Sequence, residues 1–331
     1  MLLKKLDKSN IKRILIISLS NIGDVILTFP AIDVIREYFP RAKISVAVGP
    51  KAQSLLNGNP NFEEIIIFDK RESGPKLLSW VMKMRKKRFD MVIDFRQSAI
   101  PLMMMPKYRT TLRSPVEKVH MQQKHLNRLK TLMAIDGKSK KLYSLFVSEV
   151  DRAATRELIK KEIGGQQPFV VFAPGAANHA KRWAEEGFAQ VADHLAEQHN
   201  LKIVFIGDNV DRAIADKIIS KMRHGAVNFC GRISLVQAAE VLRHSLLAIV
   251  NDSAPMHLAS YLNVPVVAIF GPSDPTRYGP WSEKSKYIQG QTICRRCNEP
   301  KSKHEHTCMA SIHSDDILKS FRIEQGKIVF S

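Results

Sequence analysis

Short apolar runs alternate with amphipathic stretches along most of the 331-residue chain. The runs have the length of single strands and are almost continuously apolar, as expected for strands buried on both faces of a parallel sheet. The stretches between them repeat apolar residues with a helical period. The predicted strands are Ile14–Leu19, Ile44–Val48, Ile65–Phe68, Met91–Phe95, Phe169–Ala173, Lys202–Gly207, Val227–Phe229, Leu246–Val250 and Val264–Phe270. This pattern predicts an α/β protein with doubly wound parallel sheets.

The length and one clear break predict two domains. Gly164-Gly165-Gln166-Gln167-Pro168 interrupts the pattern, and strand and helix alternation then restarts. We therefore expect one doubly wound domain over residues 1–160 and a second over 161–331. A cleft between the two domains is the natural place for an active site. Periodicity is weak from Ser114 to Val150, which predicts a loop or the approach to a linker.

The chain's most informative stretch runs from Leu246 to Trp281. It reads as strand, short helix and strand, so its polar loops should lie at the carboxyl edge of a parallel sheet. Pro255 suits the first turn of the helix, because its missing N–H has no partner to lose there. The amides of Ser253 and Ala254 are then free to point at an anion such as a phosphate.

Two other loops that follow predicted strands carry candidate chemistry. Gly23 allows a tight turn into a helix, and Asp24 lies in the first turn of that helix, where it is either a simple cap or a functional carboxylate. After the strand Phe169–Ala173, small residues lead to Lys181 and Arg182, whose side chains can reach a diphosphate or simply be solvated.

Charge narrows the range of partners without choosing one. Lysine and arginine number 51 against 32 acidic residues, a formal charge of +19, which attracts nucleic acid, anionic lipid or phosphorylated substrates. Aromatic residues do not interleave with the basic clusters, which argues against nucleic acid, while a merely solvated basic face stays open. Ala99–Met105 contains three consecutive methionines, which suit core packing or contact with an acyl chain or membrane surface. No apolar run has the length of a membrane span and residues 1–10 make a poor signal peptide, so we expect a cytoplasmic protein.

Cysteine and histidine cluster near the C-terminus, as Cys294-x-x-Cys297 followed by His304, His306 and Cys308. The first pair has the spacing of zinc ligands, and Cys294, Cys297, His306 and Cys308 could hold a structural zinc; a loop with free thiols is the alternative. Cys230 is most simply a small core residue.

Four motifs in this order resemble the bacterial glycosyltransferases of family 9, which include the ADP-heptose:lipopolysaccharide heptosyltransferases. They are residues 14–25 (Ile-Leu-Ile-Ile-Ser-Leu-Ser-Asn-Ile-Gly-Asp-Val), Pro174-Gly175 through Lys181-Arg182-Trp183, residues 251–259 (Asn-Asp-Ser-Ala-Pro-Met-His-Leu-Ala), and residues 270–275 (Phe-Gly-Pro-Ser-Asp-Pro). The late cysteines look like that family as well.

The resemblance implies a GT-B fold of two Rossmann-like domains facing a cleft, with the acceptor bound by the N-terminal domain and the nucleotide sugar by the C-terminal one. It also implies a C-terminal helix able to pack back on the N-terminal domain. It implies metal-independent transfer with inversion at the anomeric carbon, in which Asp24 is the general base and Lys181 offsets charge on the leaving diphosphate. The donor site implied by the matching positions is Gly175, Asn178, Asp252, Ser253, Ala254, Met256 and His257, and the acceptor site includes Ser20 and Gly23. Inverting transfer needs a base on the acceptor side and electrostatic support on the leaving-group side, and these residues supply both.

The predicted function is therefore transfer of heptose from ADP-heptose to the lipopolysaccharide inner core. The expected partners are the ADP-sugar, a lipid-anchored anionic acceptor and the inner face of the inner membrane, with no nucleic acid and no cofactor needed for catalysis. One alternative is the same mechanism with another nucleotide sugar or glycan acceptor. A non-catalytic binding protein that retains the fold is another, and a nucleic-acid binder rests on the charge alone.

Overall fold

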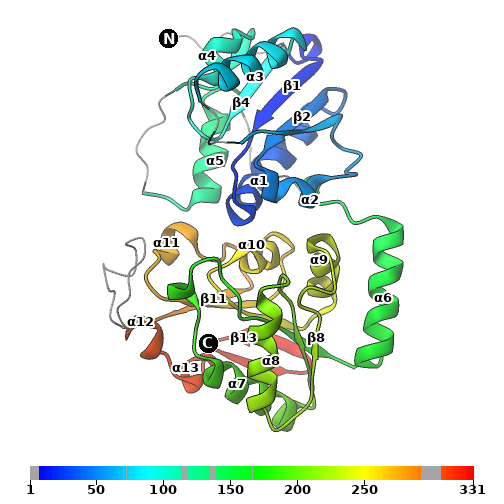
Figure 1. Ribbon diagram of the computed structural model, residues 1–331, viewed down its shortest axis with the longest axis vertical. Coiled ribbons are helices and arrows are strands. Elements are labelled where there is room, and N and C mark those ends of the chain that lie inside the picture. The colour runs from blue at the N-terminus through cyan, green and yellow to red at the C-terminus, as the bar shows by residue number, and fades with distance from the viewer. Residues whose placement is uncertain are drawn as a thin grey trace. The chain divides into compact units, whose positions relative to one another are not determined.

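The computed structural model describes residues 7–69, 71, 73–112, 118–134, 139, 141–165, 167–291 and 307–331. The chain divides into two compact units, Met1–Phe146 and Val147–Ser331. Each is built around its own parallel sheet with helices packed on it (Figure 1). In the described ranges no helix is both long enough and apolar enough to cross a membrane.

The first unit contains a five-stranded sheet in the order β3-β2-β1-β4-β5. Its elements are η1 (Lys8–Asn10), β1 (Arg13–Ile17), α1 (Ile22–Tyr38), β2 (Lys43–Val48), η2 (Pro50–Ala52), α2 (Gln53–Leu56), β3 (Glu64–Ile67), α3 (Gly74–Lys86), β4 (Met91–Asp94), α4 (Ile100–Met104), β5 (Tyr108–Arg109) and α5 (Met121–Lys130). Residues 14–17 of the central strand β1 are fully buried between β2 and β4, as their unbroken apolar run predicts.

Helix α5 is a correction to the sequence analysis, which expected a loop or linker from Ser114 to Val150. This helix packs on α1, and its Leu126 and Leu129 are buried. Arg128 is buried as well, and its guanidinium donates to the carbonyl oxygens of Asp94 and Thr111 at 2.5 and 2.7 Å. A buried helix that satisfies polar side chains through tertiary hydrogen bonds has a weak apolar period, which is why the pattern did not reveal it.

The second unit contains a six-stranded sheet in the order β11-β10-β9-β6-β7-β8 and a two-stranded hairpin. Its elements are α6 (Glu149–Ile163), β6 (Phe169–Ala173), η3 (His179–Lys181), α7 (Glu185–His199), β7 (Lys202–Phe205), α8 (Asp211–Lys221), β8 (Ala226–Asn228), α9 (Leu235–His244), β9 (Leu247–Asn251), α10 (Ala254–Tyr261), β10 (Val266–Phe270), α11 (Pro275–Tyr278), β11 (Ser285–Gln289), α12 (Thr307–Ala310), α13 (Ser314–Leu318), β12 (Phe321–Glu324) and β13 (Lys327–Phe330).

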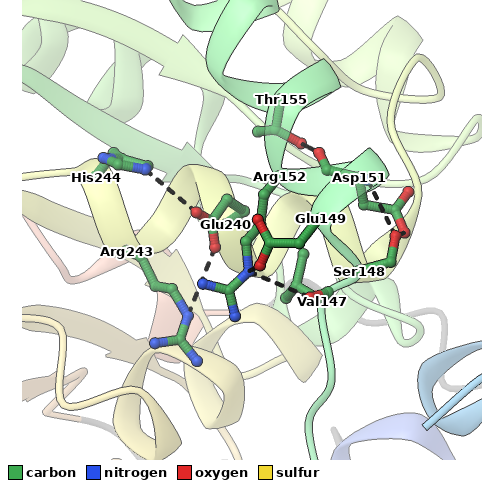
Figure 2. Close-up of polar contacts among 9 residues, drawn as sticks. All are labelled: Val147, Ser148, Glu149, Asp151, Arg152, Thr155, Glu240, Arg243 and His244. Atoms are coloured by element: carbon green, nitrogen blue, oxygen red, sulfur yellow. Dashed lines mark hydrogen bonds and ion pairs between the residues drawn. The ribbon is translucent and has the colours of Figure 1, made fainter.

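Helix α6 belongs to the second unit, whereas the sequence analysis placed the boundary near residue 160. It packs against α9 (Figure 2). Ser148 caps its start by accepting from the amide of Asp151 at 3.0 Å, and Arg152 donates to the carbonyl oxygen of Val147 at 3.2 Å. On the facing helix α9, the carboxylate of Glu240 is buried beside Arg243 and His244, at 3.8 and 3.3 Å. The helix thus starts immediately after the division between the units.

The C-terminal residues also belong to the second unit. Helix α13 packs on α7, and the indole N–H of Trp183 donates to the carbonyl oxygen of Ile312 at 3.0 Å. Ile317 and Phe321 are buried in the same core as Trp183. The chain ends in the β12–β13 hairpin, which belongs to the second unit. That a C-terminal helix packs back on the first domain stays a prediction.

Candidate active site

The strand order of the second unit creates one switch point, between β6 and β9. From β6 the chain moves through β7 and β8 on one side, and it then crosses to β9 on the other side of β6. In sheets of this kind ligands bind at the carboxyl ends of the two strands where the order reverses. The loops that begin there are residues 174–182 and residues 251–253, the two stretches that the sequence analysis selected.

An ion pair joins these two loops. Lys181 places its ammonium 2.7 Å from the carboxylate of Asp252, and the two side chains are 30% and 6% exposed. The neighbouring residue Asn251 is buried; its amide donates to the carbonyl oxygen of Pro174 at 2.7 Å and accepts from the amide of Trp183 at 3.2 Å. These contacts hold one cation and one carboxylate at fixed positions on the carboxyl edge of the sheet.

Helix α10 starts at this edge with the geometry expected from the sequence. Ser253 is the extended residue before the helix, and Pro255 occupies its first turn. The Ser253 hydroxyl donates to the carbonyl oxygen of Asn251 at 3.2 Å and does not cap the helix. Ala254 is the first helical residue and has no positive φ, so an alanine is accommodated there without strain. The amides at the start of α10 therefore remain available to an anion.

Of the other predicted donor-site residues, Gly175 and Asn178 determine the conformation of the loop after β6, and Met256 packs in the core. A Cβ at Gly175 would lie 2.1 Å from the Asp211 carboxylate, so only glycine allows these chain segments to approach. Asn178 accepts from the amide of Ala180 at 3.0 Å and starts the short helix η3, which carries Lys181. Met256 is fully buried in the core of the unit.

His257 is 6% exposed and stacks on Trp281, with ring centroids 5.8 Å apart. Trp281 lies in the segment after α11, so the ring pair connects the start of α10 to the loop that follows β10. This contact orients the imidazole next to the switch point.

The first unit has its own switch point, between β1 and β4. Ser20 lies in the loop after β1, and Asp24 lies in the first turn of α1. The Asp24 carboxylate accepts from the side-chain amide of Asn21 at 2.9 Å and is half-buried. Within the described part of the chain it forms no ion pair with Lys, Arg or His. Gly23 precedes it inside the helix and, like Ser20, is half-buried.

The structure adds Arg96, which the sequence analysis did not select. It follows β4, and its guanidinium donates to the Ser20 hydroxyl at 3.2 Å and lies 4.8 Å from the centroid of the Phe68 ring. Burial lowers the pKa of Arg96, and nearby Asp94 opposes that shift. The Asp94 carboxylate is itself committed to the amide of Arg96 and to the amide and hydroxyl of Ser98, at 2.7 to 2.8 Å.

Arg96 therefore presents a cation beside the Ser20–Asp24 loop without pairing to a carboxylate in the described residues. Its only sequence signal is a basic residue directly after a predicted strand. That signal becomes meaningful once β4 is known to be the neighbour of β1.

The predicted zinc ligands are only partly covered by the structure. Cys294, Cys297 and His306 lie outside the described residues. Cys308 is fully buried beside Gly271 and Gly290: a Cβ added at Gly271 would lie 3.3 Å from its sulfur, and one added at Gly290 would lie 1.7 Å from its carbonyl oxygen. Among the residues described, no group of three or more His, Cys, Asp or Glu could hold a metal ion. Cys230 is buried in the core, and burial raises its pKa to about 12.

A family model described as glycosyltransferase family 9 (heptosyltransferase) matches residues 78–308. The chain belongs to this family. Its membership confirms the resemblance derived from the four motifs, and it makes the protein a glycosyltransferase of the heptosyltransferase family.

Relatives and solved structures agree with this assignment. The lipopolysaccharide core heptosyltransferase OpsX of Haemophilus influenzae is 24% identical over 297 residues, which cover 84% of each chain. The glycosyltransferase family 9 structure from Veillonella parvula aligns with a TM-score of 0.78 at 24% identity, covering 93% of this chain and 95% of that one. The E. coli ADP-heptose lipopolysaccharide heptosyltransferase II aligns with a TM-score of 0.71 at 23% identity, covering 92% and 96%. The predicted fold class, two Rossmann-like domains of the GT-B type, is confirmed.

Proposed function

We propose that this family 9 glycosyltransferase transfers a heptose from ADP-heptose to the lipopolysaccharide inner core, with inversion at the anomeric carbon. The observation that carries the proposal is the pairing of Lys181 with Asp252 at the switch point of the second unit, beside the free amides of α10. The names of the Haemophilus and E. coli relatives supply the donor and the acceptor class.

The second unit would bind the ADP-sugar. The Lys181 ammonium and the amides at Ser253 and Ala254 supply positive charge and hydrogen-bond donors to the diphosphate. Asp252 orients Lys181 and, with His257, borders the sugar. Gly175 and Asn178 contribute by keeping the loop after β6 narrow and by placing Lys181. Met256 supports α10 from within the core.

The first unit would bind the acceptor. Asp24 takes the proton from the acceptor hydroxyl as its oxygen forms a bond to the anomeric carbon, while the bond from that carbon to the diphosphate oxygen breaks and ADP leaves. Gly23 and Ser20 shape the loop around this carboxylate. Arg96 offers a guanidinium to a carboxylate or phosphate of the acceptor, which suits the fork geometry of arginine. Charge on leaving ADP is then offset by Lys181 and the α10 amides, so the proposed transfer is metal-independent.

The main test combines a donor panel with a variant of the proposed base. Purified enzyme is incubated with an inner-core acceptor fragment and ADP-heptose, or with other nucleotide sugars. We expect turnover of ADP-heptose, and Asp24→Asn should lower kcat by a factor of about 10² to 10⁴ with ADP-heptose binding unchanged. Glu37→Gln, an exposed carboxylate on the same helix α1, is the matched control and should retain full activity.

The outcomes separate the candidate functions. Turnover of a different nucleotide sugar with the same dependence on Asp24 would establish the same mechanism with another donor. Donor binding without any transfer would instead identify a non-catalytic binding protein. Equal activity of the wild-type enzyme and Asp24→Asn would refute the assignment of the base.

We further propose that the reaction takes place at the cytoplasmic face of the inner membrane, where a lipid-anchored acceptor would be presented. Supporting this proposal are the acceptor class named for the relatives and the formal charge of +19, which favours an anionic surface. Cell fractionation with and without high salt tests it, because an electrostatically held peripheral protein is released by salt.

A further inference from the structure

Two neighbouring helices of the first unit expose an unusual number of large apolar side chains. Helices α3 and α4 pack against each other and lie side by side in Figure 1. The exposed apolar side chains are Leu78 (51%), Met82 (47%), Leu102 (45%), Met103 (39%) and Met105 (60%). We call these five residues the α3–α4 surface.

These residues are exposed although both helices already have a buried face. On α3, Leu77, Trp80, Val81 and Met84 face the core, and on α4 Ile100 and Met104 do so. Leu78 and Met82 lie one turn apart, away from that buried face. The three consecutive methionines of the sequence thus divide, with Met104 buried and Met103 and Met105 outside. The core of the first unit thus explains the buried apolar residues of α3 and α4, but it does not explain the exposed ones of the α3–α4 surface.

The charged side chains on these two helices have one sign. Neither α3 nor α4 contains an acidic residue, whereas α3 carries the exposed cations Lys76, Lys83, Arg85 and Lys86. No ion pair with a described residue involves any of these four. Of the described acidic residues near these helices in sequence, Asp69 pairs with Arg71, Asp90 accepts from the amides of Lys12 and Arg13, and Asp94 is buried.

We propose that the α3–α4 surface docks this enzyme on an anionic lipid bilayer. Leucine and flexible methionine side chains enter the boundary between head groups and acyl chains, while the lysines and arginine of α3 contact lipid phosphates. An anionic bilayer has both an acyl interior that can accept exposed apolar side chains and head-group phosphates that attract the neighbouring lysine and arginine side chains. A protein partner would need acidic residues around an apolar face, and it is treated as an outcome of the test.

The first experiment measures binding of the full-length protein to vesicles by co-sedimentation. Vesicles of phosphatidylglycerol with phosphatidylethanolamine are compared with vesicles of phosphatidylcholine alone. We expect binding only to the anionic vesicles. The double variant Met82→Gln/Met105→Gln should bind at least about tenfold more weakly. Val150→Gln removes an apolar side chain of 80% exposure from α6 in the second unit and should bind like the wild type.

A second variant separates charge from apolar insertion. Lys83→Gln/Lys86→Gln should weaken binding about tenfold or more at low salt, and the difference from the wild type should shrink as salt is added. Far-UV circular dichroism of both double variants checks that α3 and α4 remain folded, and the substituted side chains are exposed, so no loss of stability is expected.

The proposal is independent of the assignment of donor and base, because vesicle binding requires neither substrate. Transfer to a water-soluble acceptor fragment should be unchanged in both double variants, whereas transfer to an acceptor embedded in anionic vesicles should fall. Absence of wild-type binding to anionic vesicles, or equal binding by the Met82→Gln/Met105→Gln variant, would overturn the proposal. A dimer by light scattering that this variant dissociates would identify a self-association surface and overturn it as well.

Discussion

The Lys181–Asp252 pair allows stability and catalysis to be separated by one set of variants. Lys181→Met removes the ammonium and keeps most of the apolar stem, which leaves the Asp252 carboxylate, 6% exposed, without its partner. A hydrogen bond to a charged group contributes about 1.5–3 kcal/mol. Because Lys181 is 30% exposed, we expect a loss in this range and not the larger cost of breaking a fully buried pair.

The assay is urea denaturation monitored by tryptophan fluorescence in a Trp80→Phe background. The remaining tryptophans, Trp183 and Trp281, both lie in the second unit and report its unfolding. Lys181→Met should lower the unfolding free energy by about 1.5–3 kcal/mol. The double variant Lys181→Met/Asp252→Asn should recover part of the loss, with a coupling energy of about 1–2 kcal/mol.

Activity should follow a different pattern in the same proteins. The proposed role of Lys181 is to offset charge on the leaving diphosphate, so kcat should stay low in the double variant even where stability recovers. Lys221→Met makes the same chemical change at a lysine that pairs with Glu185 and Glu186, two carboxylates far more exposed than that of Asp252, and it should leave the denaturation midpoint nearly unchanged. A Lys181→Met protein as stable as the wild type, or a double variant with the summed loss of the two single variants, would refute the reasoning.

Three further predictions concern the first unit and the C-terminal segment. Arg96→Ala should lower kcat/KM for an anionic acceptor roughly 10- to 100-fold with donor affinity unchanged, and a neutral acceptor analogue should be unaffected, as steady-state kinetics would show. Burial lowers the pKa of His125 to about 3, so between about pH 6.5 and 3 the unfolded chain binds a proton that the folded protein does not, and the unfolding free energy falls as the pH drops. His125→Leu should reduce the dependence of the unfolding free energy on pH by up to about 1.4 kcal/mol per pH unit, as denaturation at several pH values would show. Gly290→Ala would place a Cβ 1.7 Å from the Cys308 carbonyl oxygen and should cost about 1–3 kcal/mol, whereas Gly225→Ala, with open space around it, should be neutral in a thermal melt.

Most strands and the main site loops could be predicted because buried parallel strands leave strong local patterns. The loops that carry Asp24, Lys181 and Asp252 directly follow predicted strands, and this position is enough to mark them as candidate site loops. The contact between Lys181 and Asp252 was not, because it joins residues 71 positions apart and depends on β6 and β9 being neighbours. Strand order is a non-local property that single-strand patterns do not encode.

The features that escaped prediction have weak local signals for identifiable reasons. Helix α5 can bury the polar side chain of Arg128 because carbonyl oxygens of other segments accept its hydrogen bonds, and its sequence therefore lacks a strong apolar period. The edge strand β11 (Ser285–Gln289) is only half-buried, so it lacks the continuous apolar run of the central strands. Arg96 is one basic residue among many in a chain with a formal charge of +19, and only its contact with Ser20 distinguishes it.

Because α6 packs on α9, a chimera of two relatives keeps this helix contact intact only if the halves are joined before α6. Exchange of halves between two relatives at the Gly164–Gly165 break would separate α6 from α9, so that each chimera would pair two helix surfaces that did not evolve together. Exchange between Phe146 and Val147 would carry the cap at Ser148, the whole of α6 and the buried Glu240 together with the proposed donor unit. Chimeras joined at that position could therefore assign donor preference to one half and acceptor preference to the other.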